Sequence, residues 1–164
     1  MANLLKEQKK ELLTKAFDEN PDLAKGKKLC GIVVLLWILP RALHLAAALV
    51  LAFTIDIAIL SATNIAALVI VILFSIGIYN GTKAFAILPI IGGAIMTLQI
   101  FTAEIYTMLG PDYLTIARVY AILFILASVA QLILPIILLV SNSSKQYFNT
   151  VQTINKELLS KPKT

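Results

Sequence analysis

The sequence has few of the residues on which most enzyme chemistry depends. It contains one cysteine, Cys30, and one histidine, His44, among 164 residues. A single cysteine excludes an internal disulfide and the paired-thiol chemistry of membrane quinone-linked oxidoreductases. A lone histidine beside an arginine is more often a packed, hydrogen-bonded side chain than a ligand, because metal sites normally need several ligands. We therefore predict no bound metal and no cofactor.

The motifs of common catalytic and nucleotide-binding sites are also missing. The sequence has no HExxH, no CxxC and no Walker or Rossmann glycine pattern. Cys30 and His44 would lie about 20 Å apart along one helix at 1.5 Å per residue, too far for a nucleophile and its base. The residues for each usual reaction class are absent, so we predict that the protein is not an enzyme.

Charged residues are scarce in the middle of the chain. Overall, 59% of the residues are hydrophobic and 14% are charged, whereas a soluble domain is nearer one half and one quarter. The apolar residues fall into four blocks, each about long enough to cross a hydrocarbon core of roughly 30 Å. We therefore predict an all-α polytopic membrane protein, a four-transmembrane-helix bundle in contact with the lipid bilayer. The predicted crossings cover residues 29–60, 62–80, 84–109 and 113–140, with a tight turn at 61–64.

Both ends of the chain differ from this apolar centre. Residues 1–28 are predicted to form an amphipathic segment, broken at Asn20-Pro21-Asp22, that lies on the membrane or against the C-terminal tail. Residues 141–164 are predicted to form a basic amphipathic tail. Its apolar stripe consists of Tyr147, Val151, Ile154 and Leu158.

The lysines and arginines predict the orientation in the membrane. Seven lysines precede Leu29, four follow Val140 and Lys83 lies in a predicted turn, which accounts for 12 of the 14 Lys and Arg residues. Since positive charge favours the cytoplasmic side, both termini should be cytoplasmic, in a bacterial plasma membrane. The net charge of +5 lies mostly in these tails, which favours an anionic leaflet over nucleic acid as the partner.

Two short patterns occur twice in the chain. Ile-Leu-Pro occurs at residues 38–40 and 87–89, and Phe-Thr-x-acid-Ile at 53–57 and 101–105. These repeats indicate two tandem helical hairpins related by a pseudo-two-fold axis along the membrane normal. Chance recurrence in an Ile- and Leu-rich sequence is the alternative, since Ile-Leu-Pro also occurs at 133–135.

The few ionisable residues inside the predicted crossings form two candidate sites. The outer site consists of Asp56, Glu104 and Arg118, where a Glu104–Arg118 ion pair is expected because an unpaired charge at membrane depth is costly. This pair is either a structural clamp or an ion or proton site. The inner site consists of Arg41, His44, Gln131 and Ser128. Arg41 and His44 should share a helix face, although Arg41 could instead extend to cytoplasmic phosphates.

Two functions fit these features. The first is a non-enzymatic membrane protein that acts by binding proteins or lipids, in an accessory, regulatory or immunity-type role, as a homo-oligomer or with another membrane protein. The alternative is a small transporter or ion- or proton-conducting protein that uses Asp56, Glu104 and Arg118.

Overall fold

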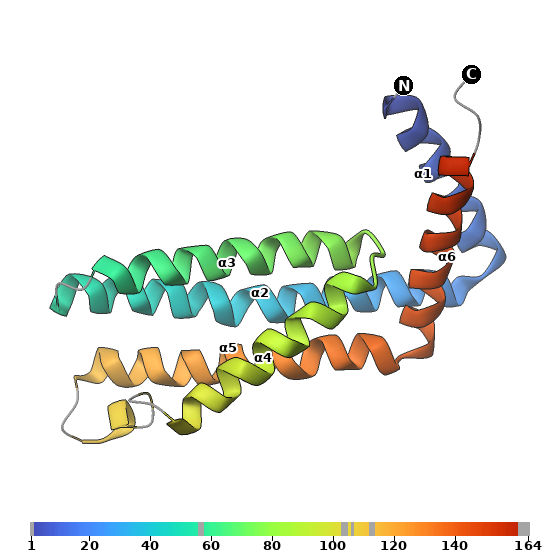
Figure 1. Cartoon of the computed structure of the whole chain (residues 1–164). Helices are drawn as coiled ribbons and strands as arrows, with labels where there is room; N and C mark the ends of the chain where they lie inside the picture. Colours follow the sequence, from blue (N-terminus) through green and yellow to red (C-terminus); the bar gives the residue numbers. More distant parts are fainter. Residues whose placement is uncertain (1, 56–57, 103–104, 106, 112–113, 161–164) are drawn as a thin grey trace.

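The computed structural model describes residues 2–55, 58–102, 105, 107–111 and 114–160, and this part of the chain is helical, without a strand (Figure 1). Side chains are described for residues 6–54, 64–98, 105, 108–111 and 114–160. Six α-helices and one short 3₁₀ helix follow one another in these described residues. They are α1 (Ala2–Glu19), α2 (Pro21–Ile55), α3 (Ala58–Tyr79), α4 (Ala84–Thr102), η1 (Thr107–Leu109), α5 (Thr115–Val140) and α6 (Asn142–Ser160).

Two of these helices, α2 and α5, are long and apolar enough to cross a membrane. Over the described side chains, the apolar parts of α3 and α4 are shorter and cover Asn64–Tyr79 and Ala84–Leu98. Length and composition therefore support two crossing helices, where the sequence predicted four.

The turn predicted at residues 61–64 is wrong, because these residues are helical and belong to α3. The first long helix, α2, ends at Ile55 and α3 begins at Ala58, so the first hairpin reverses earlier than predicted. The polar residue Asn64, which suggested a turn, is buried, and its side chain hydrogen-bonds Tyr120. A polar residue with a partner on another helix does not interrupt a helix.

The other predicted boundaries agree more closely. The third predicted crossing extended to residue 109, but α4 ends at Thr102 and a separate 3₁₀ turn follows at Thr107–Leu109. The fourth, predicted from residue 113, corresponds to α5 from Thr115 to Val140. Both α2 and α5 continue as helices through a proline, Pro40 and Pro135 respectively.

α2 and α5 form the centre of the bundle (Figure 1). α3 packs along α2, and α4 crosses α5 obliquely. A Cβ atom at Gly93 would lie 2.8 Å from the backbone nitrogen of Leu132, so α4 and α5 can approach this closely only because the residue is glycine.

The two predicted hairpins are present, but their packing lacks the expected pseudo-two-fold symmetry. Such symmetry would make the α2–α5 contact equivalent to a contact between α3 and α4. α2 packs extensively on α5, whereas α3 and α4 meet much less, beside their shared turn, where the Phe74 and Phe85 rings lie 5.5 Å apart. The duplicated patterns therefore do not correspond to duplicated packing.

α1 and α6, the first and the last helix, form a head at one end of the bundle (Figure 1). The predicted break at Asn20 separates α1 from α2. The Asn20 side-chain oxygen accepts a hydrogen bond of 3.0 Å from the Asp22 backbone N–H, and Pro21 is the first residue of α2. Asn followed by Pro is a favourable helix start, because the asparagine satisfies a free N–H and proline has none.

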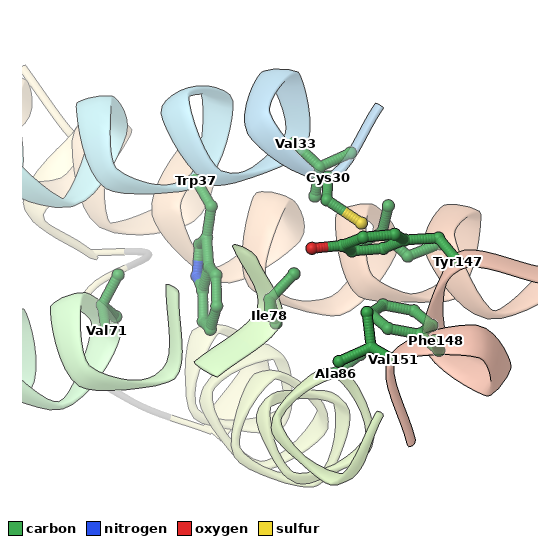
Figure 2. Close-up of a cluster of buried hydrophobic side chains, with 10 residues drawn as sticks. Cys30, Val33, Trp37, Val71, Ile78, Ala86, Tyr147, Phe148 and Val151 are labelled. Atoms are coloured by element: carbon green, nitrogen blue, oxygen red, sulfur yellow. The ribbon is translucent and has the colours of Figure 1, made fainter. Parts of the chain in front are cut away.

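α6 closes this end of the bundle. Figure 2 shows Cys30, Val33 and Trp37 of α2, Ile78 of α3 and Ala86 of α4 gathered around three side chains of α6, Tyr147, Phe148 and Val151. The predicted stripe of α6 is thus buried within the chain, against the ends of the bundle helices and against α1. It is not a free surface for pairing with another protein.

The turn between α3 and α4 is fixed by glycine and by α6. Gly81 has φ +81°, and the Gly81 and Thr82 N–H groups donate to the carbonyls of Ile78 and Gly77, which is the Schellman pattern of a helix end. The Val151 side chain covers Gly81, and the Tyr147 hydroxyl donates a hydrogen bond of 2.7 Å to the Tyr79 carbonyl. The predicted turn after Asn80 is confirmed, and it lies against α6.

Candidate functional site

Arg41 and His44 lie together inside the bundle, on one face of α2. Their side chains are buried, with 6% and 0% of their surface exposed, and Arg41 Nη1 lies 3.4 Å from His44 Nδ1. The predicted shared face is confirmed. A guanidinium has only donors, so Nδ1 must accept this hydrogen bond and the ring proton lies on Nε2.

Aromatic residues of α5 surround this histidine. The imidazole lies 4.6 Å from the Tyr120 ring and 5.3 Å from the Phe124 ring, measured between centroids. Tyr120 also hydrogen-bonds the Asn64 side chain of α3. We call Arg41, His44, Asn64, Tyr120 and Phe124 the buried polar cluster.

Sequence reasoning found only two of these five residues. Asn64 lies in the stretch that the sequence predicted to be a turn. Tyr120 was not among the predicted polar site residues, because it lies in an apolar helix. The available signals were a polar residue inside an apolar block and the four-residue spacing of Tyr120 and Phe124, which places both on one helix face.

The other two residues of the predicted inner site bond elsewhere. The Ser128 hydroxyl donates to the Phe124 carbonyl of its own helix at 2.7 Å. Gln131 Nε2 donates to the Pro89 carbonyl at 3.4 Å and so joins α5 to α4. Of the four predicted residues, only Arg41 and His44 are brought into direct contact by the described hydrogen bonds.

The outer site is described only in part. Asp56 and Glu104 lie outside the described residues, so the Glu104–Arg118 ion pair stays a prediction. Arg118 Nη2 donates to the Pro111 carbonyl, at the end of the bundle away from the head. Its Nε is buried and has no hydrogen bond within the described part of the chain.

The buried polar cluster presents hydrogen-bond donors. Arg41 Nε and His44 Nε2 are buried and have no hydrogen-bond partner in the described structure. Buried polar groups are normally hydrogen-bonded, so these unpaired donors lower the stability of the fold unless a ligand binds them or favourable packing offsets the loss. In the described residues, no group of three or more His, Cys, Asp or Glu side chains lies together as a metal site would require. The cluster is therefore suited to hydrogen bonding with an acceptor or to joining helices.

Comparison with known protein families, with curated proteins and with solved structures finds no match to this chain.

Proposed function

We propose that this protein is a four-span integral membrane protein that acts by binding a lipid or another protein, without catalysis. Its helices α2 to α5 would cross a bacterial plasma membrane, with α1 and α6 as a cytoplasmic head. Its role would be accessory, regulatory or of the immunity type.

The observation that carries this proposal is the apolar outer surface of all four bundle helices. Large hydrophobic side chains point outward along each of them, for example Leu35, Leu73, Leu98 and Ile133. A soluble protein rarely exposes contiguous apolar surface of this extent, whereas lipid-facing helices require it. Their lengths agree: 22 residues in α3 and 19 in α4 correspond to about 33 and 28 Å at 1.5 Å per residue.

The distribution of polar residues supports binding over catalysis. In the described part of the bundle, Gln131 hydrogen-bonds the Pro89 carbonyl of α4, and the buried His44 ring stacks on Tyr120 of α5. Most of the described lysines, aspartates and glutamates lie in α1, at the start of α2 and in α6, where a partner at the membrane surface can reach them.

The test is membrane retention followed by native electrophoresis and flux measurement. After an alkaline carbonate wash, the chain should stay in the membrane fraction. Mild detergent should then release a species larger than its 17.9 kDa mass plus a detergent micelle, or a monomer that carries bound lipid. Release by carbonate would contradict the membrane assignment, and a lipid-free monomer in every mild detergent would contradict binding.

Ion or proton conduction is the second candidate, favoured by the unpaired donors Arg41 Nε and His44 Nε2 within the bundle. Ionisable groups at membrane depth often belong to conduction paths. If this function is correct, Glu104→Gln should change proton or cation flux in liposomes. Absence of flux in the wild type across several cations and pH gradients would remove this candidate.

A further inference from the structure

Two hollows adjoin where α1 meets the start of α2 and the end of α3. The first, of about 790 Å³, lies between α1 and the α3–α4 turn, and we call it the basic hollow. Lys6, Lys9, Lys10 and Lys27 line it together with one acidic residue, Glu7. The second, of about 630 Å³, lies along the first turns of α2, and we call it the apolar hollow. Its lining includes Gly31, Ile32, Val34 and Leu35.

Lys27 and Phe17 line both hollows and join them. The Lys27 ammonium lies 5.5 Å from the centroid of the Phe17 ring and 5.5 Å from that of Tyr79. Contact with two ring faces holds this charge in place, while its N–H donors can still reach an anion. A positive group is thus fixed at the boundary between the charged and the apolar surface.

The apolar surface continues from this boundary along the bundle. A third hollow, of about 260 Å³, lies between α2 and α3 and shares Val34 and Tyr79 with the apolar hollow. Ser75 also lines it, and the Ser75 hydroxyl is buried without a hydrogen bond in the described structure. Beside it, Leu35 and Ile76 are exposed by 70% and 54%. A hydrocarbon chain entering here would meet mostly apolar side chains.

The excess of positive charge on α1 lies on this side of the helix. A neighbouring hollow shares Glu7 and Lys10 with the basic hollow, and Lys15, Glu11 and Asp18 also line it. The basic hollow has four lysines to one glutamate. The asymmetry gives the head one surface that attracts anions.

We propose that these hollows bind one anionic phospholipid, with its phosphate among the lysines of the basic hollow and an acyl chain in the apolar hollow and along the α2–α3 groove. The inference rests on the proposed function, since it requires the bundle to lie in a bilayer. A soluble phosphate would use only the basic hollow, and an uncharged lipid only the apolar one. An anionic phospholipid uses both, and the junction lies where Lys27 and Lys28 precede the apolar run of α2.

The experiment is native mass spectrometry of the delipidated full-length protein, titrated with phosphatidylglycerol or with phosphatidylcholine of the same chains. The wild type should bind one phosphatidylglycerol more tightly than phosphatidylcholine. The triple variant Lys9→Gln, Lys10→Gln, Lys27→Gln should lose at least about tenfold in phosphatidylglycerol affinity, since each lysine near an anionic lipid contributes about fivefold. Lys27→Arg keeps the charge and the ring contacts, and should keep the binding.

A matched control removes the same charge elsewhere. The control triple variant changes three exposed lysines outside both hollows, in the substitutions Lys15→Gln, Lys145→Gln and Lys156→Gln. It should alter phosphatidylglycerol affinity less than twofold. Circular dichroism melting checks that both triple variants are folded. If the site triple is not folded, Lys9→Gln and Lys10→Gln are made singly. Neither side chain is buried, so both variants should fold, and each should lose about fivefold in phosphatidylglycerol affinity.

Several results would overturn the proposal. Equal affinity for the two lipids, equal loss in the control triple, or displacement of the lipid by glycerol phosphate alone would each do so. Occupation of the hollows by an acidic protein segment, seen as protection of α1 by a copurified chain and not by lipid, would do so as well. Failure of the carbonate test rejects the proposed function itself, whereas retention in the membrane without phosphatidylglycerol preference rejects only this inference.

Discussion

At the residue scale, Tyr147 shows how one side chain joins α6 to the bundle. It is 3% exposed, and its hydroxyl donates to the Tyr79 carbonyl at the end of α3. Burial, together with the smaller effects of the nearby Cys30 and Tyr79, raises the pKa of the Tyr147 phenol to about 12. The folded protein therefore favours the neutral phenol over its ionised form.

This pKa predicts a pH dependence of stability. An unfolded tyrosine ionises near pH 10, so the stabilisation from the neutral phenol is complete below pH 10 and is lost as the pH rises from 10 to about 12. Tyr147→Phe should lower stability at pH 7 by about 1 kcal/mol, because the Tyr79 carbonyl loses its partner. Thermal unfolding of both proteins in detergent should show this gap narrowing between pH 10 and 12. A gap that stays constant over this range would contradict the assignment.

Gly93 is the residue that permits the crossing of α4 and α5. A methyl group there would lie 2.8 Å from a backbone atom of α5, which cannot move aside as a flexible side chain can. Gly93→Ala should therefore destabilise the protein by about 1–3 kcal/mol. Gly31→Ala is the matched control, since its Cβ would meet only the Tyr79 ring at 3.6 Å. Unfolding in detergent should separate the two variants, and equal melting temperatures would argue against a tight crossing.

At the element scale, the sequence predicted the helices better than their contacts. Apolar blocks, the break at Asn20-Pro21 and the predicted turn around Lys83 located most helix ends, because these depend on local backbone chemistry. The turn predicted at residues 61–64 was wrong. Asn64 is part of α3 and hydrogen-bonds Tyr120, more than 50 residues away, and the local sequence does not reveal this partner. The stripe of α6 was identified correctly, but its burial against α2 depends on tertiary packing that periodicity does not report.

The candidate site was predictable to a similar degree. The spacing of Arg41 and His44 places them on one face of any helix, and the structure has them in contact. Gln131 was predicted to join them, yet it bonds to α4 instead, because its position along α5 does not determine which neighbouring helix its side chain faces. Asn64 and Tyr120 were missed, since their meeting depends on how α3 and α5 both pack against α2.

At the scale of the whole molecule, the position of the α3–α4 turn bears on the number of crossings. This turn lies at the head end of the bundle, where Gly81 packs against Val151 of α6, and α1 lies at the same end (Figure 1). α3 and α4 therefore run the length of the bundle beside α2 and α5. If α2 and α5 cross the bilayer, their neighbours should cross it too.

Cysteine labelling at Lys83 distinguishes four crossings from two. In a Cys30→Ala background, Lys83→Cys should react with a membrane-impermeant maleimide only after the cells are opened, like Lys156→Cys in α6, because four crossings return this turn to the cytoplasm. Pro111→Cys, at the other end of the bundle, should react in intact cells. With two crossings, α3 and α4 would both stay outside, and Lys83→Cys would react in intact cells like Pro111→Cys. Such a result would place the α3–α4 turn and α6 on opposite sides of the membrane. It would therefore contradict the contact between Gly81 and Val151.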